Sequence, residues 1–349
     1  DAPVATTDVI TVFSRVPQSL DQVGSATSIL TGEAIELQQI QVLDQALERV
    51  PGVTVTRSGG FGQNTQVRMR GFTTKHVLTI IDGVKITNPA EFDNQFGVEH
   101  VMLDNIERIE VLRGPQSGIY GADAVAGVIN IVTRRGSGDP DLRLSAMAGS
   151  NETYEISAGS QGAVMDGRLG YSASVSYFDT EGISLASRAP GNTEEDGYDN
   201  LSFIANADYD FTSRLSGRAG VRWSDSKNET DTNFTQTFDP SAPFYRPDLP
   251  PFLFQDSEGF VESTQGIYYA GLAYEGDLVS HDAQISFTDL DTESEDPGGA
   301  FVSEGQGLEA QYFATIDIGR AGVLGEESFL LIGADAREDS AFYDQVRGF

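Results

Sequence analysis

The stretch that decides the fold is Glu107–Thr133, ERIEVLRGPQSGIYGADAVAGVINIVT. It predicts a strand over Ile109–Leu112, a tight turn, a segment of small residues and a second strand over Val128–Thr133. Its four glycines give the backbone freedom and permit close approach of other chain segments. The stretch contains nothing suited to nucleophilic catalysis or metal capture. These features favour a segment that packs tightly inside a larger structure.

The residues before this stretch predict a compact mixed α/β unit. Ser25–Val55 has the pattern strand, helix, helix, strand, with Thr31 as the expected N-cap of the first helix. A further strand is predicted over Val77–Ile81 and is followed by Asp82-Gly83, a strong turn signal. The unit therefore ends with the second strand of the opening stretch.

After the turn-rich boundary Arg134–Asp141 the hydropathy pattern changes to a period of two. Apolar residues alternate with polar ones in about nine segments, which indicates antiparallel strands. A soluble sandwich would show the same alternation. Three features favour a membrane barrel: the strands are long, aromatic residues mark their ends, and short turns alternate with long polar loops, expected at Asp225–Ser263 and Thr292–Gly305.

The strand count predicts an incomplete barrel. Nine is an odd number, whereas single-chain bacterial barrels have even strand numbers. A cylinder of about nine strands would also be filled by its own side chains, while barrels of roughly 22 strands hold a plug. We therefore expect the N-terminal part of a longer protein, with about 12 or 13 more strands to follow. No signal peptide is visible, so we expect Asp1 to begin a processed chain.

The composition excludes several classes of function. The chain has 53 acidic and 22 basic residues and a net charge of −31, which argues against nucleic acid as a partner. It has no cysteine, so disulfides, thiol nucleophiles and cysteine-bound zinc are excluded. Its three histidines show no metal-ligand spacing, and no G-x-S-x-G elbow is present. We therefore predict that the protein is not an enzyme.

Further motifs follow one another in order: Arg68–Phe72 (RMRGF), Ile80–Val84 (IIDGV), Arg113–Pro115 (RGP) and Tyr120-Gly121. With the opening stretch they resemble the plug domain of TonB-dependent outer-membrane receptors, which carry scarce large nutrients into Gram-negative bacteria. The resemblance implies a mixed α/β plug domain followed by an antiparallel transmembrane β-barrel of the roughly 22-stranded type, incomplete here. It divides the chain into a terminal segment (1–14), a plug domain (15–135) and the first part of the barrel (136–349). It also implies the outer membrane, with its lipid, as the location.

The terminal segment contains one short apolar stretch, formed by Asp8, Val9, Ile10, Thr11 and Val12. In character and position it resembles the TonB box, an extended segment that adds as a strand to TonB. Such β-augmentation draws its affinity from backbone hydrogen bonds. The resemblance therefore implies TonB, with its inner-membrane energising complex, as a partner. The alternative is an ordinary edge strand.

Two loops of the plug are candidates for ligand contact. The loop Gly59–Asn64 lacks the third glycine of a dinucleotide site and is followed by a strand. In plug domains this region faces the ligand, which makes Phe61 and Asn64 candidates. The second loop is Lys85–Phe96. Its candidates are Asn88, Phe92, Asp93 and Asn94. Exposed aromatic and amide groups suit a large polar ligand. For each single residue, a role in the scaffold is the favoured alternative.

The plug resembles most closely the cobalamin-transporter branch of this family. The shared motifs are Pro51–Val53 (PGV), Gly59–Gln63 (GGFGQ), Met69–Gly71 (MRG), His76–Leu78 (HVL) and Ile81–Val84 (IDGV). The resemblance implies import of cobalamin or a related corrinoid. A ferric siderophore or haem is the runner-up, because the second loop diverges. A passive porin or an outer-membrane enzyme is the rival from another class, and neither would have a plug or a TonB box.

The same resemblance implies a calcium site, although no cofactor is required for transport. The branch binds calcium through aspartates in its first extracellular loops. The corresponding carboxylates here are Glu194, Glu195, Asp196, Asp199 and Asp231. Clustered oxygen ligands suit a hard cation. Glutamate stands where an aspartate is expected, and the alternative is a solvated acidic loop.

Overall fold

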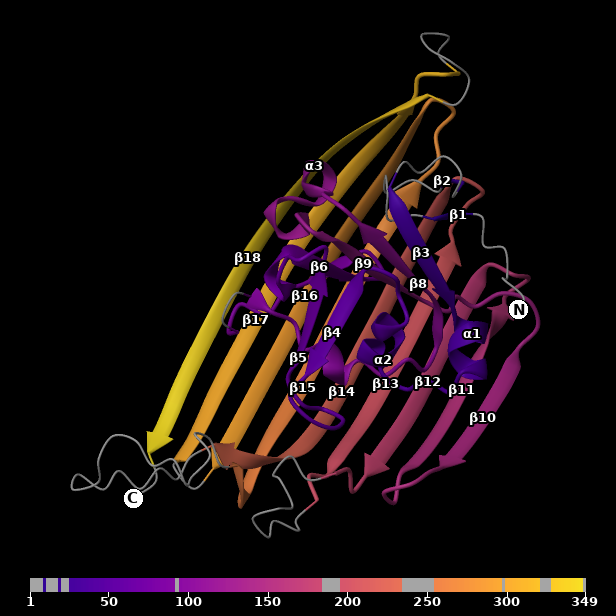
Figure 1. The fold of residues 1–349 in the computed structure, drawn as a ribbon. Helices are drawn as coiled ribbons and strands as arrows, with labels where there is room; N and C mark the ends of the chain where they lie inside the picture. Colours follow the sequence, from indigo (N-terminus) through magenta and orange to yellow (C-terminus); the bar gives the residue numbers. More distant parts are fainter. Residues whose placement is uncertain are drawn as a thin grey trace, which may run out of the picture.

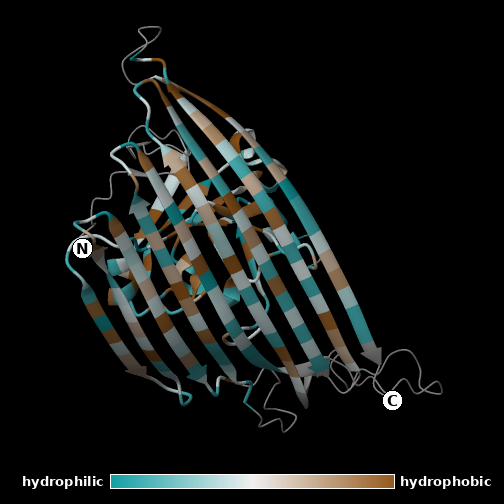
Figure 2. Ribbon diagram, turned by 180° about the vertical axis from the view of Figure 1, so that it is seen from behind, coloured by the Kyte–Doolittle hydropathy of each residue, from teal (hydrophilic) through white to brown (hydrophobic). Residues whose placement is uncertain are grey.

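A computed structural model describes residues 9–10, 18–19, 25–91, 94–183, 195–233, 254–296, 299–320 and 328–347. The chain has two parts, which we call the plug (residues 25–133) and the wall (a large antiparallel sheet). The plug lies against one face of the wall (Figure 1), and the wall covers it when the molecule is seen from behind (Figure 2).

The plug is built on a five-stranded sheet with the order β3-β8-β9-β6-β7. All neighbours are antiparallel except β6 and β9. The strands are β3 (Ala26–Thr31), β6 (Val77–Ile81), β7 (Val84–Ile86), β8 (Ile106–Arg113) and β9 (Gly127–Thr133). Both predicted strands of the opening stretch are therefore confirmed, and they pair with each other.

Short helices and one hairpin complete the plug. Thr31 caps α1 through its Oγ1, which accepts a hydrogen bond from Ala34 N at 3.2 Å, as predicted. The elements are α1 (Gly32–Leu37), α2 (Leu43–Glu48), β4 (Val53–Arg57), β5 (Thr65–Met69), η2 (Thr74–His76), η4 (Val98–His100), α3 (Ser117–Tyr120) and η5 (Ala122–Ala124). The predicted order of strand, helix, helix, strand is confirmed. Across the described ranges, no helix combines the length and hydropathy needed to cross a membrane.

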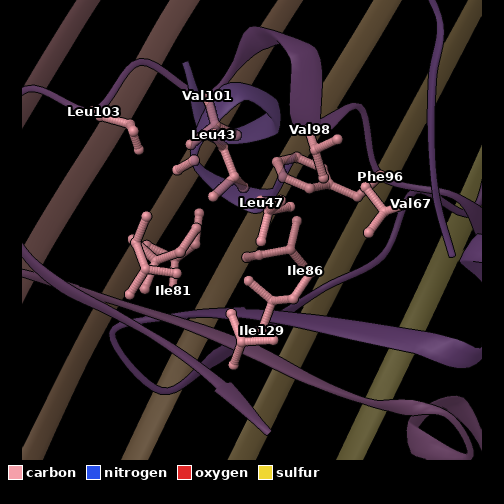
Figure 3. Close-up of a cluster of buried hydrophobic side chains, with 14 of the residues drawn as sticks. Leu43, Leu47, Val67, Ile81, Ile86, Phe96, Val98, Val101, Leu103 and Ile129 are labelled. Carbon is pink, nitrogen blue, oxygen red and sulfur yellow. The ribbon is translucent and has the colours of Figure 1, made fainter. Parts of the chain in front are cut away.

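The plug has its own apolar core. Leu43 and Leu47 recur at helical spacing on α2 and are fully buried, opposite Ile81 and Ile86 of the sheet (Figure 3). At Gly127 an added Cβ would lie 2.3 Å from Leu112 O, so only glycine allows β8 and β9 to meet there. The close approach predicted from the glycines is confirmed at this position.

The wall is a nine-stranded sheet in which each strand pairs with the next along the chain. Its strands are β10 (Asp141–Ala148), β11 (Tyr154–Val164), β12 (Leu169–Thr180), β13 (Tyr198–Asp210), β14 (Leu215–Asn233), β15 (Phe254–Tyr274), β16 (Val279–Asp296), β17 (Gly299–Asp317) and β18 (Phe329–Arg347). The count of nine is confirmed. Along β13, Asn200 and Ser202 are buried toward the plug, whereas Leu201 and Phe203 face outward. This alternation gives the striped pattern seen in Figure 2.

The two long loops predicted from the sequence are wrong in extent. β14 continues to Asn233 and β15 begins at Phe254, so both ends of the expected loop Asp225–Ser263 are strand. The expected loop Thr292–Gly305 is almost entirely strand, because β16 reaches Asp296 and β17 starts at Gly299. Residues 225–233 and 292–296 are polar on both faces, and the extensions of β15 and β17 place apolar residues next to each other. The hydropathy alternation is therefore lost although the backbone ladder continues.

Candidate functional site: the apical loops and the plug–wall interface

The first candidate loop connects β4 to β5 and is closed by a hydrogen bond from Ser58 N to Asn64 O of 3.0 Å. Phe61 is half-buried, and its ring centroid lies 4.9 Å from that of Phe178 in β12. Asn64 is exposed. Of the two predicted ligand contacts on this loop, Phe61 is therefore engaged with the wall and Asn64 is free to meet solvent.

The same loop is seated on the far ends of the wall strands. A Cβ at Gly62 would lie 2.2 Å from the ring of Tyr198, so glycine allows the backbone to lie against that ring. Gln63 Nε2 donates to Glu229 O of β14 at 2.8 Å. The β12–β13 and β14–β15 connections lie at this end of the wall. We call it the apical end.

The second candidate loop follows β7. Asn88 is 7% exposed, and its Oδ1 accepts a hydrogen bond from Ala90 N at 3.0 Å. Asn94 is exposed and has a left-handed φ of 54°, which asparagine tolerates. Phe92 and Asp93 lie outside the described residues. The structure thus gives Asn88 a role in shaping the loop and leaves Asn94 accessible.

The predicted calcium ligands fall only partly within the described structure. Glu195 is exposed, Asp196 is buried and Asp199 is half-buried in β13. Asp199 lies directly opposite Asp179 on one side and Lys227 on the other. Glu194 lies outside the described residues, as does the side chain of Asp231.

Two of these residues, Glu195 and Asp199, border a recess of about 510 Å³ at the apical end of β12–β14. Its rim carries five carboxylates: Asp179, Glu181, Glu195, Asp199 and Glu229. Repulsion by Glu152 raises the pKa of the exposed Glu181, as crowding of like charges predicts. Among the residues that the structure describes, no three histidine or carboxylate groups are placed to hold a metal ion.

The predicted TonB box is described at two of its five residues. Val9 and Ile10 form β1 and pair antiparallel with β2 (Gln18–Ser19). Asp8, Thr11 and Val12 lie outside the described residues. The backbone at Val9–Ile10 is therefore extended, the conformation that strand addition uses.

The plug–wall interface is polar, and sequence reasoning did not identify its members. His100 is buried in η4, and burial lowers its pKa to about 4, so the ring is neutral. Ser226 Oγ and Tyr198 Oη of the wall lie 3.1 and 3.4 Å from His100 Nδ1. Arg222 Nη2 donates to Met102 O of the plug at 3.2 Å. The sequence feature that could have identified these contacts is the run of polar residues on the inward face of each wall strand.

A second polar network joins the end of the plug to the wall. Asn206 Nδ2 donates to Thr133 Oγ1 at 2.7 Å, and Tyr269 Oη donates to Asn206 Oδ1 at 2.9 Å. Arg135 forms an ion pair of 2.8 Å with Asp208 of β13. These contacts hold the chain where the plug passes into the wall.

One expectation about charge pairs in the plug needs correction. Arg70, Arg113, Glu107 and Glu110 are the plug residues that the sequence offers as candidates for charge pairs, either within the plug or against the wall. Instead Arg108 pairs with both glutamates, at 2.5 and 2.7 Å. Arg113 donates to backbone carbonyl oxygens, and in the described part of the chain neither it nor Arg70 has an ion pair. The reason is register, since Arg108 and Glu110 lie on the same side of β8.

A plug seated on the inner face of an amphipathic antiparallel sheet defines a class: plug-and-barrel membrane receptors. The profile of the TonB-dependent Receptor Plug Domain matches residues 19–128. Residues 19–128 are thus a plug domain of the TonB-dependent receptor type, and this likeness places the protein in the outer membrane of a Gram-negative bacterium.

Two curated relatives are vitamin B12 transporters. The chain is 34% identical over 230 residues to vitamin B12 transporter BtuB of Vibrio vulnificus, covering 66% of this chain and 37% of the relative. It is 33% identical over 207 residues to BtuB of Photobacterium profundum, covering 58% of this chain and 33% of the relative. The chain thus spans about a third of the length of the relatives it matches.

Solved structures share the fold. FpvA of P. aeruginosa, bound to heterologous pyoverdines, has a TM-score of 0.78 at 14% identity, covering 97% of this chain and 45% of FpvA. The ferric enterobactin receptor PfeA of Pseudomonas aeruginosa, in complex with enterobactin, has a TM-score of 0.70 at 21% identity, covering 90% of this chain and 49% of PfeA. At such identities the likeness establishes the architecture of plug and wall.

Proposed function

We propose that the complete receptor actively imports cobalamin or a related corrinoid across the outer membrane. The observation that carries the proposal is a docked plug with two apical loops in a chain that is 34% identical over 230 residues to a vitamin B12 transporter. The exposed amides of Asn64 and Asn94 supply polar groups for a large polar ligand. The reaction is transport without bond chemistry, so no residue is assigned a catalytic role.

Calorimetry on the full-length receptor tests this ligand. Cyanocobalamin, ferric pyoverdine, ferric enterobactin and haem are titrated separately into the same preparation. The expected result is binding of cyanocobalamin and no heat from the other three. Binding of a ferric chelate or haem alone would replace the corrinoid with the runner-up ligand class.

Energy for import comes from TonB and its inner-membrane complex in this proposal. The extended Val9–Ile10 supports it, because an extended apolar segment in a polar terminus can add to a sheet of the partner. Ile10→Pro removes a backbone donor and should abolish uptake while leaving ligand binding at the cell surface unchanged. Ile10→Val, which keeps the donor, is the matched control and should transport normally. Normal uptake by the proline variant would show that this segment is not the coupling site, and uptake in cells lacking TonB would indicate a passive pore.

Calcium is proposed to organise the acidic recess at the apical end. Five carboxylates around one recess repel one another, and a divalent cation with oxygen ligands would relieve that repulsion. Ordered loops lose less entropy on ligand capture, so calcium should tighten cyanocobalamin binding. The measurement is a titration of ligand with calcium, with magnesium and with chelator. Equal affinities in all three would leave the recess as a solvated acidic surface.

A further inference from the structure

The second apical loop is tied to the wall through the lysine that precedes it. Lys85 lies in β7, and its Nζ is 3.3 Å from Glu309 Oε1 of β17 and 3.5 Å from Asp335 Oδ2 of β18. The side chains of Lys85 and Glu309 are 13% and 3% exposed. One plug cation therefore bridges two adjacent wall strands, with a buried partner in β17 and a half-exposed one in β18.

Glu309 depends on this cation. Both of its carboxylate oxygens are buried, and within the described ranges neither accepts a hydrogen bond. A buried carboxylate without hydrogen-bond donors is costly unless a cation stands close to it. Lys85 supplies that charge at 3.3 Å, and Arg337, directly opposite Glu309 in the ladder of β17 and β18, is a second cation beside it. The wall thus fixes where the end of β7 must lie.

The backbone at this end of β7 is held as well. Arg337 Nη1 donates to Lys85 O at 3.1 Å, and Tyr343 Oη donates to Pro89 O at 3.4 Å. Both donors come from β18. The side chain of Lys85 and the backbone that follows it are thus both bound by β17 and β18.

The turn that follows fits closely against β17. A Cβ at Gly305 would lie 2.2 Å from Asn88 Oδ1, so only glycine leaves room for that amide. The same Oδ1 accepts from Ala90 N at 3.0 Å, and Asn88 O accepts from Glu91 N at 3.1 Å. The amides of Ala90 and Glu91 therefore report on whether the turn is formed.

We propose that Lys85 is a positioning residue: its ion pair with Glu309 fixes residues 87–91 against the wall and thereby preforms the second apical loop for its ligand. The role of the loop in binding rests on the proposed function, whereas the anchoring of the turn does not. Preorganisation of a loop lowers the entropy lost on binding. Release of the ion pair should accordingly loosen the turn and weaken ligand capture, without any contact between Lys85 and the ligand.

The experiment compares Lys85→Met with Lys85→Met/Glu309→Gln in the full-length receptor. The single variant leaves a buried charge without its partner and can fail to fold. The double variant removes both charges and should fold, while the anchor stays absent. Hydrogen exchange at the Ala90 and Glu91 amides is measured without ligand, and cyanocobalamin affinity is measured by calorimetry. Exchange should rise and affinity should fall by about tenfold in the double variant, the scale of one lost charged contact.

Asp208→Asn is the matched control, because it removes the ion pair of Asp208 with Arg135 at the Thr133 end of the plug and leaves Arg135 its contact of 3.7 Å with Asp82. Exchange at Ala90 and Glu91 should be unchanged in this variant. Lys85→Arg keeps the cation and should restore most of the protection.

Each outcome decides the proposal. Unchanged exchange in the double variant would overturn the anchor, and raised exchange with unchanged affinity would overturn the positioning role. Equal loosening by Asp208→Asn would show general weakening of the interface and would also overturn it. A wild-type receptor that does not bind cyanocobalamin would contradict the proposed function alone. The hydrogen-exchange comparison would still test whether the Lys85–Glu309 ion pair holds the turn.

Discussion

The plug and the wall are both rich in β-strands, yet they bury opposite kinds of side chain. In the plug the interior is mainly apolar, with Leu43, Leu47 and Ile109 fully enclosed. Its buried polar groups are fewer and several are paired with one another, as where Arg108 and Asn130 donate to Glu110. The inward face of the wall instead buries hydroxyls and amides such as Ser224 and Asn206. This difference indicates that the plug is stabilised by its own apolar core, while its contact with the wall is a polar interface of modest strength.

A few inward-facing wall residues are apolar and pack against the plug. Ile267 and Leu290 join the apolar core of the plug, and Phe178 packs with Met102 in a smaller cluster. They give the plug a fixed seat on β12, β15 and β16. The polar contacts around them then set its orientation without burying a large apolar area, so a plug that shifts under force exposes little apolar surface.

The largest effect should follow from damage to the plug core. Leu43→Ala deletes a fully buried side chain from α2 and should destabilise the plug by about 2–5 kcal/mol. The readout is urea-dependent hydrogen exchange of plug amides in the full-length receptor. Leu201→Ala, on the outward face of β13, is the control and should leave plug exchange unchanged. Equal loss in both variants would mean that plug and wall unfold together.

Much of the plug could be predicted from the sequence, because its elements carry local signals. Thr31 caps a helix, Asp82-Gly83 turns a hairpin with positive φ at both residues, and Leu43 and Leu47 lie on one helical face. In the wall, alternation predicted nine strands. It failed where strands extend past the apolar band, as in residues 225–233, since hydropathy no longer marks the two faces.

The candidate site was less accessible to sequence reasoning. Contacts such as Lys85 with Glu309 join residues more than two hundred positions apart, and no local pattern marks them. Asn88 was predicted as a ligand contact from its loop position, but its burial against Gly305 depends on the docking of plug on wall. The identity of the ligand likewise rested on motif resemblance, because individual loop residues carry no unique chemistry.

A second prediction concerns the buried carboxyl of Glu99, which lies in η4 at the boundary between plug and wall. Burial raises its pKa to about 8, with nearby Asp44 and Glu91 adding repulsion. The folded plug therefore binds more protons than the unfolded chain between the ordinary pKa and about 8, so its stability must fall as pH rises through this window. Burial of His100 acts in the opposite direction between about pH 4 and about pH 6.5, because there the unfolded histidine binds a proton that the folded one does not.

The measurement is plug exchange between pH ~6.5 and ~8, where the slope for one such group is at most about 1.4 kcal/mol per pH unit. Exchange rates are first corrected for the intrinsic effect of pH. Glu99→Gln has no proton to lose and should flatten the profile. A wild-type profile that is already flat would show that Glu99 is ionised at neutral pH.

A smaller destabilisation is expected at the polar contacts between the end of the plug and the wall. Tyr269→Phe deletes the hydroxyl that donates to Asn206 and should cost about 1 kcal/mol, because a buried amide oxygen loses its donor. Protection should drop at the end of β9, near Thr133, which shares the Asn206 amide. Tyr268→Phe is the neighbouring control on the outward face of β15. A larger loss from Tyr268 than from Tyr269 would contradict the assignment of inward and outward faces.

The smallest effect is expected at an exposed ion pair of the wall, where a substitution tests whether exposed charges contribute to its stability. Arg214 and Asp277 form an ion pair of 2.8 Å between two short turns, with side chains 51% and 81% exposed. Solvent and salt screen such a pair, and holding two mobile side chains offsets much of its attraction. Arg214→Gln should therefore leave the unfolding midpoint of the full-length receptor unchanged at both low and high salt. A destabilisation as large as that of Tyr269→Phe, present only at low salt, would instead show that this exposed ion pair stabilises the wall. The buried polar contacts between plug and wall and the exposed charges of the turns could then no longer be ranked in that order.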